Sequence, residues 1–251
     1  MSGTGPDLSG KRAVVTGAAS GIGAAVVERL VATGADVLAA DRSEQVTGLA
    51  AGFGARSAVI DLTDLDAAGE LGAGADVVVN NAGFQHVAPV QGFPPEIFGD
   101  LLRVMVEAPF RIVRAALPGM YRAGWGRVIN ISSVHGLRAS ANKSGYVTAK
   151  HAIEGLSKTI ALEGAAQGVT SNCICPGFAR TPLVERQVAE QARLHRVPEE
   201  QVVEDVLLAR TPVKRLVEPA EVAELVAWLC GPGTASITGS SLSMDGGWTA
   251  G

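Results

Sequence analysis

The sequence is poor in aromatic residues, cysteine and histidine. Of its 251 residues, 4% are aromatic, three are cysteines and four are histidines. Cys173 and Cys175 lie in an apolar stretch and Cys230 stands alone, so we interpret all three as small buried side chains without a redox or metal role. The histidines lack the spacing of metal ligands, which argues against a catalytic metal.

Charge is scarce, and no long apolar run is present. Charged residues make up 18% of the chain, the net charge is −4 and no basic block occurs, so a nucleic-acid partner is not expected. No run approaches the roughly 18 apolar residues of a membrane span, and the first residues form no apolar signal region. We expect a soluble, cytoplasmic protein with no membrane partner. A chain of this length suffices for one large α/β domain over residues 1–251.

Apolar runs alternate with helical patterns along the chain, which predicts a parallel, doubly wound α/β sheet. Strands are predicted at residues 11–16, 36–40, 57–60, 76–80, 127–132, 169–175 and 240–245. Helices are predicted at 24–33, 101–123, 146–167 and 218–230, with a helical region opening at 93–99, a short or irregular crossover at 65–75 and a charged helical segment at 181–210. Pro109 and Pro118 predict a kink or an early stop in the helix at 101–123.

A glycine-rich turn follows the first predicted strand. In the motif T-G-A-A-S-G-I-G, Gly17, Gly21 and Gly23 stand between a strand and a helix. Glycines permit a tight turn and close approach of the backbone, and the start of the helix favours a pyrophosphate. The motif in this context predicts a phosphate-binding loop.

The residues that end the second and third strands bear on the choice of cofactor. The carboxylate of Asp41 is suited to accept hydrogen bonds from the ribose hydroxyls of adenosine, and it would repel a 2′-phosphate. Arg42 opposes this interpretation, because an arginine there can hold that phosphate. Since the glycine loop contains no basic residue, we favour NAD and leave NADP as the alternative. Asp61 and Leu62 follow the third strand, where adenine would lie.

Three polar residues between positions 133 and 150 suit proton transfer at an alcohol oxygen. Tyr146 and Lys150 share one helical face, and Ser133 follows the fifth strand. A free tyrosine has a pKa of about 10 and is a weak base at neutral pH. A nearby lysine charge lowers that pKa, so the phenol can take the proton of an alcohol as hydride leaves its carbon.

Over nearly its whole length the chain resembles the short-chain dehydrogenase/reductase family. The resemblance is carried by T-G-A-A-S-G-I-G at 16–23, Asp61, N-N-A-G at 80–83, Ser133, Y-V-T-A-K at 146–150 and P-G-F-A-R-T at 176–181. It implies a Rossmann-like sheet of seven strands in the order 3-2-1-4-5-6-7, and most often a homotetramer. It also implies that Tyr146 is the general acid/base, that Ser133 polarises the reacting oxygen, and that Lys150 binds the nicotinamide ribose. The implied cofactor-binding residues are Gly17, Ser20, Gly21, Ile22, Gly23, Asp41, Asp61, Leu62, Asn81, Ala82, Gly83, Tyr146, Lys150, Pro176, Gly177 and Thr181.

Within that family, the substrate-side residues look like those of the D-3-hydroxybutyrate dehydrogenases. The shared segments are N-N-A-G-F-Q-H at 80–86, the run at 133–146, T-P-L-V-E-R-Q at 181–187 and D-G-G-W-T at 245–249. The resemblance implies that Gln85, His135, Lys143 and Gln187 hold a substrate carboxylate and that Trp248 lines the methyl end. A buried carboxylate needs such a cation and donors. The helical segment at about 181–210 is expected to close over the substrate as a lid.

One position departs from the family pattern. Met105 stands where the family usually has an asparagine that holds a water in the proton relay, and a thioether cannot donate a hydrogen bond. Either the relay uses another water path, or part of the catalysis is lost.

From the motifs and the substrate-side residues together, we expect NAD-dependent interconversion of (R)-3-hydroxybutyrate and acetoacetate. The alternatives are another small hydroxy acid, a 3-oxoacyl thioester, a sugar alcohol, or a NAD-binding protein with weak turnover.

Overall fold

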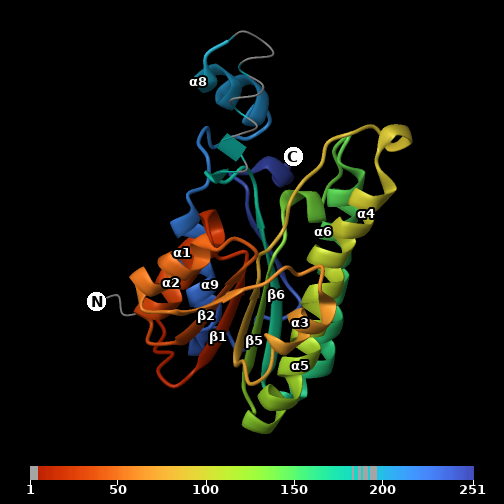
Figure 1. The fold of residues 1–251 in the computed structure, drawn as a ribbon. Coiled ribbons are helices and arrows are strands. Elements are labelled where there is room, and N and C mark those ends of the chain that lie inside the picture. The colour runs from red at the N-terminus through yellow and green to blue at the C-terminus, as the bar shows by residue number, and fades with distance from the viewer. Residues whose placement is uncertain (1–4, 183, 186–187, 189–191, 193–196) are drawn as a thin grey trace.

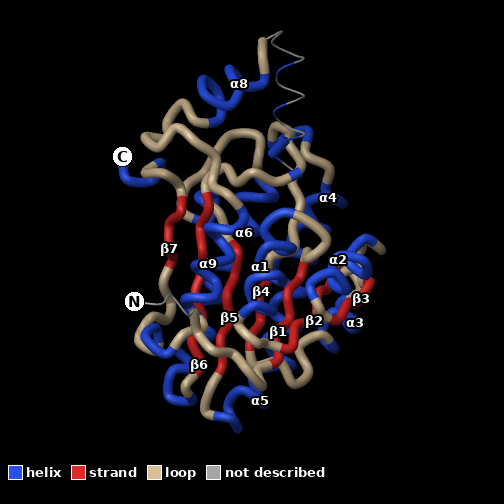
Figure 2. Tube along the Cα trace, turned by 90° about the vertical axis from the view of Figure 1, so that its left-hand side faces the viewer, coloured by secondary structure: helices blue, strands red, loops and turns tan. Residues whose placement is uncertain are grey.

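Seven parallel strands form one sheet in the order β3-β2-β1-β4-β5-β6-β7, which confirms the order predicted from the sequence (Figure 2). The computed structural model describes residues 5–182, 184–185, 188, 192 and 197–251. The strands are β1 (Arg12–Thr16), β2 (Asp36–Asp41), β3 (Arg56–Val59), β4 (Val77–Asn80), β5 (Gly126–Ile131), β6 (Val169–Pro176) and β7 (Ser241–Met244).

Helices cover both faces of the sheet (Figure 1). One face carries α1 (Gly21–Ala32), α2 (Gln45–Phe53) and α9 (Pro219–Leu229), and the other carries α3 (Leu65–Glu70), α4 (Pro95–Leu102), α5 (Ala108–Ala123) and α6 (Ser144–Gly164). The short helix α8 (Glu199–Val202) lies beyond the end of the sheet. Shorter helical turns are η1 (Val90–Gly92), η2 (Arg103–Glu107), η3 (Val134–Gly136), η4 (Ala165–Gln167), η5 (Val203–Leu207), η6 (Pro232–Thr234) and η7 (Trp248–Ala250).

The central strands are apolar because side chains on both of their faces are buried. In β4, Val77 and Val79 pack into the apolar core under α1 and α9, while Val78 packs into the core under α3, α5 and α6. Successive side chains of a strand point to opposite faces, so a strand covered by helices on both sides needs an unbroken apolar run. This is why residues 76–80 could be recognised as a buried strand.

The helix predicted at residues 101–123 is interrupted earlier than the prolines suggested. The structure has α4, then the π-helical turn η2, and then α5. Pro109 lies in the first turn of α5, where its missing N–H would have no helical partner, and Pro118 lies inside α5 without ending it. The prediction of an early stop was therefore wrong. Helix α2 was not predicted, since Gly48 and Gly52 weaken its helical pattern.

The expected short crossover at residues 65–75 is confirmed, and Gly72 explains its glycine content. Helix α3 has only six residues, and Gly72 follows it against α5. A Cβ at Gly72 would overlap the carbonyl oxygen of Ile112 and lie 3.1 Å from the Cβ of Ala115. A side chain at this position would therefore force the crossover away from α5.

We predict that Gly72→Ala lowers the free energy of unfolding by about 1–3 kcal/mol, because the added methyl group meets fixed backbone. Gly48→Ala is the matched control. Gly48 lies in α2 with nothing near its Cβ position, so the same change should be neutral or stabilising by up to about 1 kcal/mol. Urea unfolding of both variants measures the difference, and equal effects would contradict the packing argument.

Candidate active site

The glycine loop is tied to the end of β4 by hydrogen bonds around Thr16. The Thr16 Oγ1 accepts from the backbone N–H groups of Asn81 (3.0 Å) and Ala82 (3.1 Å). The Asn81 side chain donates to the carbonyls of Thr16 and Gly17, each at 3.0 Å. The Asn81 side chain therefore fixes the loop from within the protein.

Glycine is required in this loop for two different reasons. Gly17 and Gly21 have φ angles of +66° and +53°, which L side chains rarely adopt. A Cβ at Gly23 would collide with the carbonyl oxygen of Gly17 and lie 2.7 Å from Nδ2 of Asn81. Gly17 and Gly21 line the cavity above the loop, whereas Gly23 is absent from its lining and packs inward. Gly23 therefore packs against the backbone of Gly17 and the side chain of Asn81, and its expected role in cofactor binding stays a prediction.

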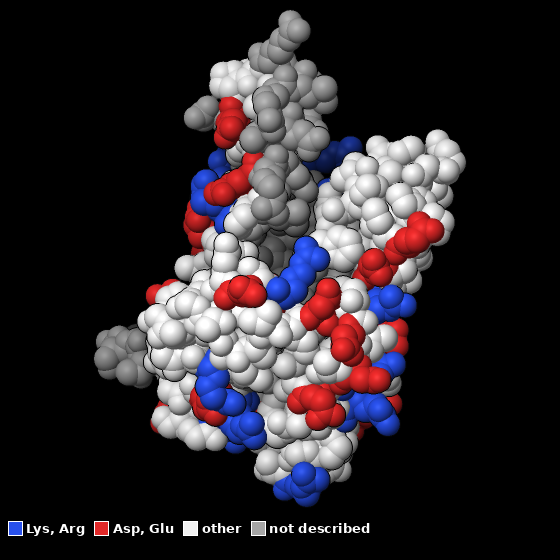
Figure 3. Space-filling view, in the orientation of Figure 1, with Lys and Arg blue, Asp and Glu red and all other residues white. Residues whose placement is uncertain are grey.

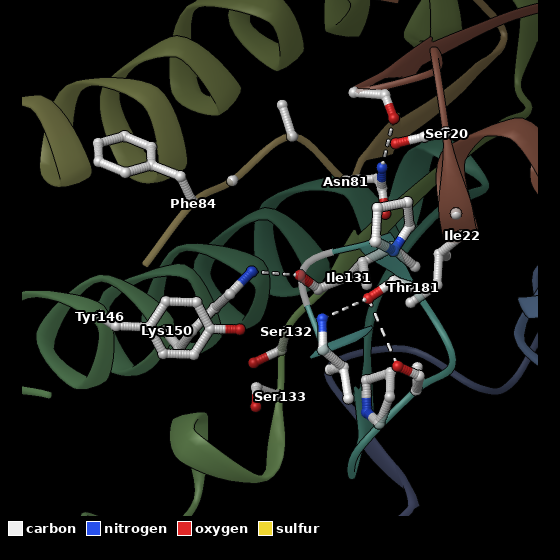
Figure 4. A pocket seen from close by; sticks show the side chains of 18 of the residues that line it. Ser20, Ile22, Asn81, Phe84, Ile131, Ser132, Ser133, Tyr146, Lys150 and Thr181 are labelled. Carbon is white, nitrogen blue, oxygen red and sulfur yellow. Dashed lines mark hydrogen bonds between the residues drawn. The ribbon is translucent and has the colours of Figure 1, made fainter. Parts of the chain in front are cut away.

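A cavity of about 340 Å³ lies at the carboxyl ends of the central strands (Figure 4). It contains most of the residues that the sequence analysis assigned to a cofactor and to proton transfer. Those residues are Gly17, Ser20, Gly21, Ile22, Asp41, Asn81, Ala82, Gly83, Ser133, Tyr146, Lys150, Pro176, Gly177 and Thr181. Positions from five strand ends therefore meet in one space, as expected of a doubly wound sheet.

An adjoining cavity extends the first toward β3 and shares Asp41, Arg42 and Gly83 with it. Asp61 and Leu62 line this extension, as the sequence analysis placed them. The Asp41 carboxylate is fixed by the backbone N–H of Ala19 (3.0 Å) and of Ser43 (2.9 Å). An elongated cavity that begins at glycines and an uncapped start of α1 and ends at a fixed carboxylate fits a dinucleotide.

Ser133, Tyr146 and Lys150 lie together at the inner end of the first cavity. Figure 4 shows the Tyr146 hydroxyl directed toward the loop of Ser132 and Ser133. The Lys150 ammonium donates to the carbonyl of Ile131 at 2.7 Å, and its nitrogen lies 5.5 Å from the centre of the Tyr146 ring. Strand β5 thus supplies the serine loop and the lysine's acceptor, while α6 supplies the phenol and the ammonium.

The pKa of Tyr146 differs in direction from the sequence-based expectation. Burial raises it, with a hydrogen bond to Ser133 acting in the opposite direction. Burial also lowers the pKa of Lys150 to about 8. The lysine charge is held at the Ile131 carbonyl, and a positive charge near the phenol acts against the effect of burial on Tyr146.

A second cavity of about 410 Å³ contains three of the five residues that the sequence analysis assigned to a substrate. His135, Lys143 and Trp248 line it, and Gly177 belongs to both this cavity and the first. The ring of His135 lies edge-on to that of Tyr146, with the centroids 5.9 Å apart. A cation, an imidazole and an indole therefore lie beside the proton-transfer group.

The other two predicted substrate residues are Gln85 and Gln187. Gln85 is half-buried in the loop after β4 and lines none of the three cavities. Gln187 lies outside the described residues, and so does much of the segment expected to form a lid. The sequence also missed Ser140, Phe178 and Arg210, which line the second cavity. Only Phe178 carried a hint, because it directly follows the Pro-Gly pair.

Met105 is buried in the π-helical turn η2, with 3% of its surface exposed. Its sulfur lies 2.8 Å from where a Cβ of Gly83 would be, so the thioether fills the space below the cavity lining. An apolar side chain packed here offers no hydrogen-bond donor to a water.

Several features that would indicate other functions are missing from the described part of the chain. No group of three His, Cys, Asp or Glu side chains in those ranges could hold a metal ion. None of the helices described there is long and apolar enough to cross a membrane. On the face drawn in Figure 3, basic and acidic side chains are interspersed.

Comparisons with known proteins cover almost the whole chain. A family profile described as enoyl-(acyl carrier protein) reductase matches residues 17–249. A D-beta-hydroxybutyrate dehydrogenase from Rhizobium meliloti (strain 1021) is 44% identical over 96% of this chain and 99% of the relative. One of the same name from Cupriavidus necator is 41% identical over 97% and 99%.

A solved structure extends the similarity to three dimensions. It comes from Beutenbergia cavernae and is provisionally named an NAD(P) dependent gluconate 5-dehydrogenase, with NADP bound at low occupancy. Its TM-score is 0.89 at 30% identity, with 98% of this chain and 99% of that chain covered. This chain thus shares its fold with a solved protein that is named for a different substrate from that of the two sequence relatives.

We predict that His135 makes the protein sensitive to acid. Burial, then the charges of Lys143 and His151, lower the pKa of His135 from 6.5 to about 4. Below about pH 6.5, His135 is protonated in the unfolded chain but stays neutral in the folded protein. The free energy of unfolding therefore falls by up to about 3 kcal/mol as the pH drops to about 4. Urea unfolding across this range should show a shallower fall for His135→Gln, and parallel curves would contradict the argument.

Proposed function

The chain belongs to the short-chain dehydrogenase/reductase family and is an oxidoreductase, and we propose that it interconverts (R)-3-hydroxybutyrate and acetoacetate with NAD. One observation carries the proposal. The cavity with Ser133, Tyr146 and Lys150 adjoins a cavity with His135, Lys143 and Trp248, and the two share Gly177. A small hydroxy acid placed across Gly177 would present its alcohol to the first set and its carboxylate to the second.

In the proposed reaction, three side chains of the first cavity have separate roles. Ser133 holds the reacting oxygen, and Tyr146 takes the hydroxyl proton during oxidation and returns it during reduction. Lys150, charged, favours the phenolate form of Tyr146 and binds the nicotinamide ribose. The bound nicotinamide supplies the acceptor for the hydride. The backbone of the glycine loop and Asp41 would hold the pyrophosphate and the adenosine ribose.

The choice of a small carboxylate as substrate is supported by the second cavity. Burial lowers the pKa of Lys143, which is the cost of enclosing a charge that a bound carboxylate would offset. The Lys143 nitrogen lies 5.9 Å from the centre of the Phe178 ring. His135 is held by Ser140, whose Oγ is 2.9 Å from Nε2, and Trp248 closes the apolar end. We propose Gln85 and Gln187 as further hydrogen-bond donors to the same carboxylate.

NAD is proposed over NADP because of the Asp41 carboxylate. Both of its oxygens are already fixed by backbone N–H groups, so it cannot turn away from a 2′-phosphate at low cost. Arg42, which lines the same cavities, would partly offset this repulsion. We therefore expect a partial preference, in which the rate with NAD exceeds the rate with NADP, and an assay with both cofactors measures this ratio.

The wider organisation that we propose is one NAD-binding domain over residues 1–251, with a lid at about 181–210, in a homotetramer. A small apolar cluster of Val184, Val188, Val202 and Leu208 is separate from the two cores of the sheet, which supports a lid with its own packing. Leu162 on α6 and Phe110 on α5 are 84% and 48% exposed, which supports an interface on these helices. A monomeric mass in solution would contradict the tetramer.

The proposal is tested first by NADH formation with purified protein, NAD and (R)-3-hydroxybutyrate. The (S) isomer and NADP serve as controls, and we expect turnover with the (R) isomer and a preference for NAD. NADH binding without turnover on a panel of small hydroxy acids would support the alternative of a cofactor-binding protein weakened by Met105. Turnover of a sugar alcohol or a thioester alone would overturn the substrate assignment.

The same assay should distinguish Lys143 from an ordinary lysine of its helix. Lys143→Met is expected to raise KM for (R)-3-hydroxybutyrate roughly 10- to 100-fold, the value of a hydrogen bond to a charged group, with NADH binding unchanged. Lys158→Met is the control, since Lys158 is exposed on α6 and carries the same charge. Similar KM values for the two variants would remove Lys143 from the substrate site.

We also predict that NAD together with substrate protects residues 181–210 from limited proteolysis. Closure of this segment over the second cavity would bury backbone that a protease needs to reach. Val206, Leu207 and Arg210 line that cavity, so the segment already contacts the expected substrate position. Cleavage of this segment at equal rates with and without the ligands would contradict the lid proposal.

A further inference from the structure

Helix α6 contains a buried carboxylate for which the proposed reaction provides no role. Glu154 lies one helical turn beyond Lys150, and each of the two side chains is only 5% exposed. Neither takes part in an ion pair among the described residues. A charged group is rarely buried without a partner, because desolvation is costly, so this pair calls for an explanation.

The Glu154 carboxylate is held in place by hydrogen-bond donors from two strands. Its Oε1 accepts from the Cys175 thiol of β6 at 3.1 Å, and its Oε2 accepts from the Ser241 hydroxyl of β7. Burial raises the pKa of the Cys175 thiol to about 12, so the thiol keeps its proton and remains a donor. Each oxygen of the carboxylate therefore has its own hydrogen-bond donor, which fixes the orientation of the side chain.

Glu154 also packs behind the turn that carries Ser133 and His135. A Cβ at Gly136 of η3 would lie 3.2 Å from Cγ of Glu154 and 3.0 Å from the carbonyl oxygen of Lys150. The carboxylate is therefore enclosed by α6, β6, β7 and η3, directly behind the inner end of the first cavity. In such a dry setting a charge acts on its neighbours more strongly than it would in water.

Lys150 has few other sources of electrostatic support. Its ammonium donates to the carbonyl of Ile131. Among the described residues, the titratable groups near it besides Glu154 are Tyr146 on α6 and Cys173 and Cys175 on β6, with His135 on η3 beside the Tyr146 ring. Burial keeps both thiols protonated, and burial keeps His135 neutral, with a pKa of about 4. Among these groups and Glu154, Glu154 is the one carboxylate.

We propose that Glu154 is a positioning residue whose buried carboxylate keeps Lys150 in its charged form below the first cavity. The role of that charge in the reaction rests on the proposed function, but the charge itself can be measured without turnover. Burial brings the pKa of Lys150 down to about 8, and the Glu154 charge acts against this decrease. Without the carboxylate, the ammonium would lose its proton nearer to neutral pH.

The decisive variant is Glu154→Gln, which removes the charge and keeps the size and one acceptor oxygen. The free energy of unfolding is measured between about pH 6 and 10. Above the folded-state pKa of Lys150 the unfolded chain binds more protons than the folded one, so stability rises with pH from about 8 in the unaltered protein. In Glu154→Gln this rise should begin about one pH unit lower.

Two controls assign the shift to Lys150 and to charge. In the Lys150→Met background, Glu154→Gln should leave the pH dependence unchanged, because the titrating ammonium is gone. Ser241→Ala removes a hydrogen bond of the carboxylate but keeps its charge, so the rise should stay near pH 8. An unshifted rise in Glu154→Gln, or the same shift in the Lys150→Met background, would overturn the proposal.

Steady-state kinetics supply a second measurement. In Glu154→Gln, the pH above which kcat falls should decrease by the same number of pH units as the pH at which stability begins to rise. A merely structural role would instead lower kcat equally at all pH values. If the unaltered protein does not turn over (R)-3-hydroxybutyrate, the proposed function fails. The unfolding experiment then still decides the role of Glu154.

Discussion

The arrangement of the site depends on the junction between the ends of β1 and β4. These strands are neighbours in the sheet, but the chain leaves β1 for α1 on one face and leaves β4 for α4 on the other. Thr16 and Asn81 join the two exits through four hydrogen bonds. A crevice opens above a strand pair whose connections diverge in this way, and here it contains the glycine loop, Gly83 and the inner residues of α6.

Charge burial is the second constraint, and it links the chemistry to the stability of the fold. Lys150 and Lys143 line the cavities, where desolvation opposes their charged forms, and Glu154 is buried behind them. A bound carboxylate would relieve the cost at Lys143, and Glu154 partly relieves it at Lys150. The burial that makes these charges costly also strengthens their action on nearby groups. Stability and reactivity should therefore respond together to pH in this protein.

The sequence predicted the sheet and the first cavity well, because both follow from short-range patterns. Buried strands read as apolar runs, and a glycine loop between a strand and a helix has few alternatives. Properties set by packing between distant segments could not be predicted. The π turn of η2 replaces a helical stop, Gly23 packs against Gly17 below the cavity lining, and Gln85 lines none of the three cavities. Glu154 was overlooked because a glutamate on a helix is usually solvent-exposed.

The two cavities are built from different parts of the fold. The first is built from strand ends and the glycine loop, so its geometry is fixed by the sheet itself. The second is built from the segment before α6, the loop after β6, and residues 206–211 and 248, all of which lie outside the sheet. Such segments can change without disturbing the core. This division is consistent with one fold being shared by proteins named for hydroxybutyrate and for gluconate, and under the proposed function the second cavity is where substrate preference would be set.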